Sequence, residues 1–312
     1  MPARAVLLDV FDRLPLVHVH SGLTAAEHEL LWQIRVPRVV LGALVGWMLA
    51  AGGAAYQGVF RNPLADPYLL GVAAGAGLGA TMAIVYGPST NNWPVDPLPL
   101  FAFVGALGAV ALTYAVGRTA DRGRTAVTLV LAGVAVAAFL TAVQTFLQQR
   151  HTDVLRQVYS WILGQLTTSG WHGVVLVLPY VVASSAVLLA HRRLLDVLRV
   201  GEDEAATLGV STRRVRLTVV VAATFGTAAV VSVSGLIGFV GIIVPHTVRL
   251  VAGASYRRVL PLSMLLGGAF LVLADVIART VSSPGEIPIG VVTAFFGAPF
   301  FVLVLRTRRS AS

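Results

Sequence analysis

The residues best suited to binding chemistry are charged side chains that stand close together in an otherwise apolar sequence. Arg35 and Arg38 lie one helical turn apart just before a long apolar run, and Asp275 and Arg279 lie four residues apart near the end of another. Paired arginines can hold the carboxylates of an acidic soluble partner, or their stems can lie against lipid while the charges reach the headgroups. Asp275 and Arg279 can also pair with each other on one helix face. Both interpretations stay open from the sequence.

The sequence contains no cluster of residues typical of catalysis. There is no cysteine, which excludes disulfides, thiolate chemistry and cysteine metal sites. His246 follows Pro245 inside an apolar run, where a lone histidine is more often a packed, hydrogen-bonded residue than a ligand. No second histidine or carboxylate stands beside it at metal-ligand spacing, and no Ser/His/Asp or paired-carboxylate site is present. We therefore predict a protein that is not an enzyme, with no cofactor and no metal site.

A short acidic segment, residues 200–209, interrupts the apolar sequence. It reads Val-Gly-Glu-Asp-Glu-Ala-Ala-Thr-Leu-Gly, and its negative charges fall where the first turn of a helix favours them. Gly209 stands where a helix commonly ends in a left-handed residue. Ala205 and Leu208, three residues apart, would share one face of a helix from about Glu202 to Leu208. The segment is either a solvated loop helix or a docking helix for a partner, within a predicted cytoplasmic region at 199–212.

Composition indicates a polytopic helical membrane protein. Of the 312 residues, 56% are hydrophobic and only 12% are charged, about half the share usual in soluble domains. Apolar runs of about 17 to 23 residues are long enough to cross the roughly 30 Å hydrocarbon layer as helices. We predict one all-α transmembrane domain over residues 1–312, an outer N-terminal segment at 1–34, and nine spans: Val39–Phe60, Leu64–Tyr86, Leu98–Gly117, Ala126–Leu147, Gly173–Ala190, Val215–Val233, Gly235–Val251, Val259–Val281 and Pro288–Leu305.

The distribution of charge orients the spans. The formal charge is +9, and all 23 basic residues are arginines. Most of them fall in the segments that share a side with residues 199–212, which places that side in the cytoplasm against anionic lipid. We therefore expect membrane lipid, and no nucleic acid, as the partner of this charge. Because there is no lysine, the chain cannot contain a standard P-loop for nucleotide hydrolysis.

A turn with two prolines joins the first two predicted spans on the inner side. It runs Arg61-Asn-Pro-Leu-Ala-Asp-Pro67, and its composition predicts a stiff turn. Such a turn is either a simple connector or a gate at the mouth of a translocation pathway.

Six motifs follow one another along nearly all of residues 31–306. They are Trp32-Gln-Ile-Arg-Val-Pro-Arg38; Arg61-Asn-Pro-Leu-Ala-Asp-Pro67 followed by Leu70-Gly-Val-Ala-Ala-Gly-Ala76; Leu131-Ala-Gly-Val134; Gly201-Glu202 with Ala205 and Leu208-Gly209; Gly238-Phe-Val-Gly-Ile-Ile-Val-Pro-His246; and Glu286-Ile-Pro-Ile-Gly-Val-Val-Thr293 with Phe296-Gly-Ala-Pro-Phe300. Together, in this order, they resemble the FecCD (BtuC-like) permease subunits of type II ABC importers.

The resemblance implies a homodimeric permease in the bacterial cytoplasmic membrane, worked by separate cytoplasmic ATPase subunits and supplied by an extracytoplasmic binding protein. It implies these roles for individual residues: ATPase coupling for Glu202, Ala205, Leu208 and Gly209; binding-protein docking for Arg35, Arg38 and Arg279; and inner gating for Asn62, Leu64 and Thr125. Family members carry ferric siderophores, haem or cobalamin, and ferric siderophore is the expected cargo on family frequency. An ATP-independent secondary transporter is the alternative; it would need coupling carboxylates at mid-membrane, where only Asp275 comes near.

One departure from the family concerns the N-terminus. Family members begin with a further span before the segment that matches Leu31, giving ten spans in all. We expect the natural product to be longer by about 20 to 40 residues, enough for one such span. N-terminal sequencing of the native protein tests this expectation.

Overall fold

The computed structural model describes residues 2–12, 22–88, 96–120, 126–167, 170–201, 207 and 211–309. Every regular element in these ranges is helical, which confirms the predicted all-α class. The elements are α1 (Ala3–Asp12), α2 (Ala25–Leu30), a π-helical turn (Leu31–Arg35), α3 (Val36–Val59), a 3-10 turn (Pro67–Leu70), α4 (Val72–Tyr86), α5 (Pro97–Ala120), α6 (Ala126–Arg150), a second 3-10 turn (Thr152–Val154), α7 (Leu155–Ile162), α8 (His172–Val200), α10 (Thr212–Ser234), α11 (Val240–Ala252), α12 (Tyr256–Thr280) and α13 (Ile289–Arg309).

Each of the nine predicted spans corresponds to one helix. Within the described residues, six helices are long and apolar enough to cross a membrane: Ala25–Val59, Pro97–Thr119, Val127–Arg150, His172–Arg199, Thr212–Ser234 and Tyr256–Thr280. Three shorter apolar helices accompany them: Val72–Tyr86, Val240–Ala252 and Ile289–Val302.

Two predicted span starts are wrong, because the chain turns before the helix begins. Helix α4 starts at Val72 rather than Leu64, after a 3-10 turn and a left-handed Gly71 with φ 87°. Helix α11 starts at Val240 rather than Gly235, and Phe239 before it has φ 69°. At 1.5 Å per residue these helices are only about 20 Å long, so neither crosses the hydrocarbon alone. An apolar run gives the length of a buried segment but not the length of its helix.

The helix that contains the first predicted span begins well before the span itself. The helix is continuous from Ala25 to Val59, whereas the apolar run alone indicates a start at Val39. A capping box starts it: the Thr24 hydroxyl accepts from the Glu27 amide, and the Glu27 carboxylate accepts from the Thr24 amide. This Thr-x-x-Glu signal is visible in the sequence. The placement of residues 1–34 outside the hydrocarbon stays a prediction.

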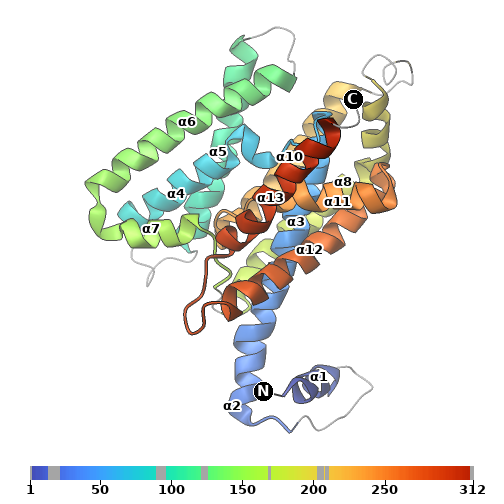
Figure 1. Ribbon diagram of the computed structural model, residues 1–312. Coiled ribbons are helices and arrows are strands. Elements are labelled where there is room, and N and C mark those ends of the chain that lie inside the picture. The colour runs from blue at the N-terminus through green and yellow to red at the C-terminus, as the bar shows by residue number, and fades with distance from the viewer. Residues whose placement is uncertain are drawn as a thin grey trace.

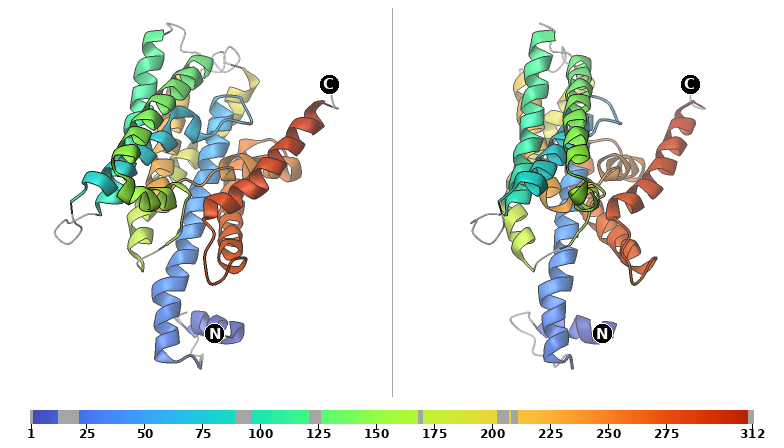
Figure 2. Two further views of the ribbon diagram at one scale, coloured as in Figure 1. Left: turned by 60° about the vertical axis from the view of Figure 1, so that its left-hand side comes forward. Right: turned by 90° about the vertical axis from the view of Figure 1, so that its left-hand side faces the viewer.

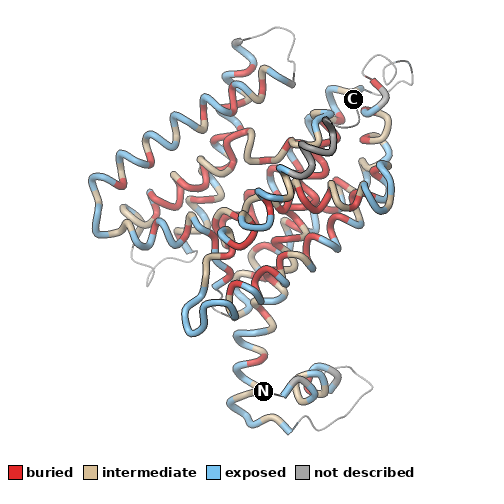
Figure 3. Tube along the Cα trace, in the orientation of Figure 1, coloured by how far each residue is buried: buried red, intermediate tan, exposed pale blue. Residues whose placement is uncertain are grey.

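Helix α3 is the centre of the molecule. It runs along the length of the bundle, with α8, α10, α11 and α12 around it and with α4, α5 and α6 as a second group to one side (Figure 1, Figure 2). From Met48 to Val59 every residue of α3 is buried. Helix α6, by contrast, exposes most of its length, and buried positions concentrate on α3 and its neighbours (Figure 3).

Glycines allow α3 to touch its neighbours backbone to backbone. A Cβ atom added to Gly46 would overlap the carbonyl oxygen of Gly267 on α12, and one added to Gly53 would overlap Gly241 on α11. Helix α4 packs in the same way, because a Cβ on Gly75 would overlap the carbonyl oxygen of Gly105 on α5.

We expect Gly53→Ala to lower the free energy of unfolding by about 2 kcal/mol or more, because the added methyl must push α3 and α11 apart. Thermal unfolding of the detergent-solubilised protein measures this. Gly108→Ala on α5 is the matched control, because a Cβ there has no heavy atom within 4 Å. Equal melting temperatures for the two variants would show that the contact is not tight.

Candidate functional site

The candidate site for a soluble partner lies at the end of the bundle that carries the start of α3. The α12–α13 connection and helices α1 and α2 lie toward this end (Figure 1). The C-terminal end of α5, the start of α6 and the end of α13 lie toward the opposite end (Figure 1). Segments predicted to be outer and inner are therefore separated in space, and we call these ends the outer end and the inner end.

Arg38 is the centre of a charged cluster at the outer end. Its Nε and Nη2 donate to Asp275 Oδ1 on α12 at 3.1 and 2.8 Å. Its Nη1 and Nη2 donate to the two carboxylate oxygens of Glu286, which precedes α13, at 3.0 and 2.8 Å. The Arg38 guanidinium thus joins three segments of the chain: the start of α3, helix α12 and the residues that precede α13. Glu286 stands in one of the family motifs, but the sequence predicts no role for it.

Arg279 and Arg35 differ in whether they already form an ion pair within the chain. Arg279 Nε lies 3.0 Å from Asp275 Oδ2, so the intrahelical pair considered from the sequence is formed. Asp275 therefore holds two arginines, and its side chain is only 4% exposed. Arg35 is exposed and forms no ion pair with any residue that the structure describes. The three predicted docking residues therefore lie toward the outer end. Arg38 and Arg279 are already paired with carboxylates of the chain, whereas Arg35 is exposed and pairs with no described carboxylate.

The cluster is close to neutral overall. Two arginines face two carboxylates, which leaves Arg35 as the main source of excess positive charge. The hydrogen bonds from Arg38 hold the pKa of Glu286 below its ordinary value, so Glu286 is charged at neutral pH. A cavity of about 100 Å³ adjoins the cluster and is lined by polar groups of Gln165 and Thr167 as well as by the ion pairs. This part of the surface already holds two carboxylates of the chain on arginine.

The predicted inner gate turn is rigid in the structure. The Asn62 side-chain oxygen accepts from the Leu64 amide at 3.0 Å, and the Asn62 carbonyl accepts from the Ala65 amide at 3.0 Å. Tyr68 fastens the end of the turn, because its hydroxyl donates to the Ile237 carbonyl at 3.2 Å. These contacts explain the stiff turn predicted from its prolines. A gating role stays a prediction, and Thr125 lies outside the described residues.

The predicted coupling residues Glu202, Ala205, Leu208 and Gly209 also lie outside the described residues. The helix that leads into them is firmly held. The Asp196 carboxylate on α8 accepts from the Ser255 hydroxyl and the Tyr256 amide, both at 2.7 Å. Arg199 donates to the Ala254 carbonyl. The end of α8 is therefore hydrogen-bonded directly to the start of α12.

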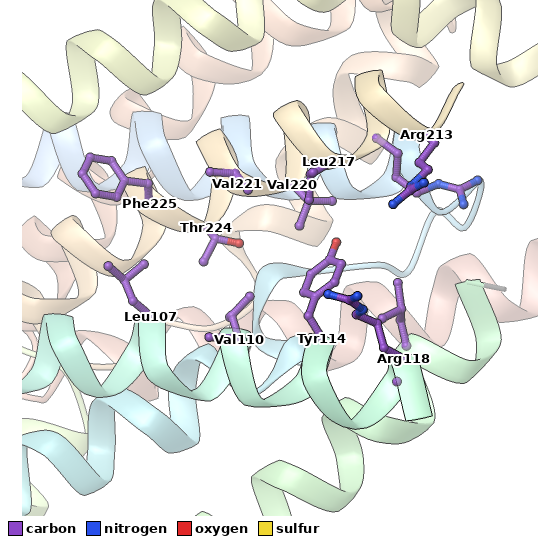
Figure 4. A pocket seen from close by; sticks show the side chains of 14 residues that line it. Leu107, Val110, Tyr114, Arg118, Arg213, Leu217, Val220, Val221, Thr224 and Phe225 are labelled. Carbon is purple, nitrogen blue, oxygen red and sulfur yellow. The ribbon is translucent and has the colours of Figure 1, made fainter. Parts of the chain in front are cut away.

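An apolar groove of about 550 Å³ lies between α5 and α10 (Figure 4). Leu107, Val110, Val221 and Phe225 line its apolar part, and Tyr114 and several arginines stand at one end (Figure 4). The groove offers no combination of side chains suited to catalysis. His246, the lone histidine considered above, packs edge-on against Phe300 with ring centroids 5.7 Å apart. Among the described residues, no three His, Cys, Asp or Glu side chains are grouped so as to hold a metal ion.

Comparison with known proteins decides the family. The model of the FecCD transport family matches residues 7–307, nearly the whole chain. The chain belongs to this family. The resemblance seen in the six motifs is thereby confirmed, and so is the prediction of a multi-pass protein of the cytoplasmic membrane.

Several FecCD relatives are similar over most of their length. The cobalamin import system permease protein BtuC of Halobacterium salinarum is 47% identical over 287 residues, 92% of this chain and 76% of the relative. The iron(3+)-hydroxamate import system permease protein FhuB of Bacillus subtilis is 36% identical, covering 93% of this chain and 74% of the relative. A solved structure described as an inward-facing conformation of a metal-chelate type ABC transporter is 30% identical, with a TM-score of 0.83, and the match covers 97% of this chain and 96% of the other.

Proposed function

We propose that this FecCD chain is the permease subunit of an ATP-driven importer and carries a large cobalt or iron chelate across the cytoplasmic membrane. The observation that carries the proposal is the match to the FecCD family over residues 7–307. The helical structure agrees with it, because it shares its fold over nearly its full length with an inward-facing transporter of the metal-chelate type. The chain makes and breaks no covalent bonds in this proposal.

In this proposal the energy comes from partner subunits, because the chain has no lysine and therefore no P-loop of its own. We place two copies of the permease together, each seated on one cytoplasmic ATPase through the segment 202–209. Closure of the ATPase pair by ATP would push this segment, and through α8 the start of α12, so that one gate opens as the other closes. Arg35, Arg38 and Arg279 would receive acidic residues of an extracytoplasmic binding protein.

Cobalamin is the cargo that the comparisons favour. The relative named for cobalamin is 47% identical, whereas relatives named for ferric hydroxamate and haemin are each 36% identical. A ferric siderophore, the cargo expected on family frequency, is the second candidate. No described residue selects between the two.

Uptake into proteoliposomes tests both the class and the cargo. With the ATPase, the binding protein and ATP present, we expect accumulation of labelled cobalamin that stops when vanadate is added, and little accumulation of ferric hydroxamate. Accumulation of ferric hydroxamate rather than cobalamin would assign an iron cargo to the same ATP-driven importer. Uptake that continues without ATP would instead indicate a secondary transporter. The structure gives that alternative little support, because Asp275 is held by both Arg38 and Arg279.

A further inference from the structure

We propose that Glu286 occupies the partner-binding face of Arg38 until a binding protein docks, and that an acidic residue of that protein then takes its place. The inference rests on the proposed docking role of the outer arginines and adds an internal competitor to it. It assigns a role to Glu286, which is not among the residues predicted to dock the binding protein.

The donors of Arg38 are divided between two very different carboxylates. Asp275 lies within α12 and its side chain is 4% exposed, so it is a permanent part of the packing. Glu286 follows a run of exposed residues between α12 and α13, and its side chain is 50% exposed. Of the two carboxylates, only that of Glu286 can exchange Arg38 for water, because the side chain of Asp275 is buried and that of Glu286 is half exposed.

The geometry of the Glu286 contact is the one that an incoming partner would need. Both carboxylate oxygens of Glu286 accept from the two terminal nitrogens of Arg38, at 3.0 and 2.8 Å. This two-pronged arrangement is the strongest way for a guanidinium to bind a carboxylate. Nε and one edge of the guanidinium are taken by Asp275. An external carboxylate can therefore reach the same fork only by displacing Glu286.

The free energy of the exchange is small, so the exchange is reversible. One arginine–carboxylate contact replaces another of the same geometry, and water and salt screen the half-exposed contact that is given up. The residues just after Glu286 are fixed to neighbouring elements by backbone hydrogen bonds. The Ile287 amide donates to the Ala278 carbonyl on α12, and the Gly290 amide donates to the Leu163 carbonyl. These bonds keep the start of α13 in place, so release of Glu286 would loosen only the exposed residues that precede Ile287.

Binding measurements with Glu286→Gln test the proposal. The probe is the purified extracytoplasmic binding protein, added to the permease–ATPase complex in nanodiscs. We expect Glu286→Gln to tighten binding by roughly two- to fivefold, the range that loss of one competing exposed ion pair gives. Glu29→Gln is the matched control, because it removes the same charge from exposed helix α2 at the outer end without touching Arg38.

Weaker or unchanged binding of Glu286→Gln would overturn the inference, and so would an equal gain in Glu29→Gln, which would reflect net charge alone.

A second measurement follows the release of Glu286 from Arg38 directly. The chain has no cysteine, so Ser282→Cys allows one spin label on the exposed segment. We expect the binding protein to mobilise this label in the wild-type background and Glu286→Gln to mobilise it beforehand. A label that docking leaves unchanged overturns the inference, whereas failure of the wild-type complex to bind at all overturns the proposed function.

Discussion

Replacing Arg38 by methionine is expected to lower the free energy of unfolding by about 3 kcal/mol, the cost of removing one partner from a buried ion pair. Asp275 would keep only Arg279, although its side chain is almost fully buried. The hydrogen bonds of Arg38 from α3 to α12 and to the segment before α13 would be lost at the same time. Thermal or denaturant unfolding in detergent measures the change.

Arg35→Met is the matched control for Arg38→Met. The two residues stand one turn apart, but Arg35 is exposed, so we expect its replacement to change stability by no more than about 0.5 kcal/mol. The double variant Arg38→Met with Asp275→Asn should recover part of the loss, because it removes the buried carboxylate that Arg279 alone would have to neutralise, and Arg279 is exposed enough for water to solvate it. Equal destabilisation by Arg35→Met and Arg38→Met would mean that the cluster is not what holds the outer end together.

Replacing Leu208 by arginine is expected to abolish ATP-driven uptake while the permease still folds. In the proposed mechanism Leu208 and Ala205 form the apolar face that seats on the ATPase, and a buried, unpaired charge there would cost several kcal/mol of binding. The measurements are uptake into proteoliposomes and co-purification of the ATPase. Unchanged uptake would remove the coupling role from this segment.

Thr207→Arg is the matched control for Leu208→Arg. It adds the same charge one position earlier, about 100° around a helix from Leu208, and Thr207 is helical and exposed in the structure. We expect Thr207→Arg to keep most of the uptake activity. Loss of uptake in both variants would indicate that charge anywhere on the segment is harmful, rather than charge on one docking face.

The fold class and the approximate spans could be predicted from the sequence, because long apolar runs have few alternatives to membrane helices. Helix ends could be predicted less well. The starts of α4 and α11 depend on left-handed residues and on contacts such as that of Tyr68 with Ile237, 169 positions away. The start of the helix that contains the first span did have a local signal, the capping box at Thr24.

Part of the candidate site could be predicted from the sequence. Arg38 and Arg279 stand out because charge is rare beside apolar runs, and the pairing of Asp275 with Arg279 follows from their spacing of four. The contact of Arg38 with Glu286 spans 248 positions, so only the packing of α3 against α12 could reveal it. Glu286 was missed for this reason: its local sequence gives no sign of which cation it meets.

The glycine contacts of α3 limit which parts of the bundle can slide. Where the backbones of Gly46 and Gly267 meet, and those of Gly53 and Gly241, no side chain is present whose rotamer could absorb a shift. Helices α3, α11 and α12 should therefore travel as one rigid unit during a transport cycle. Hinges must then be sought at its edges, where the left-handed glycines Gly71 and Gly235 stand between this unit and helices α4 and α10.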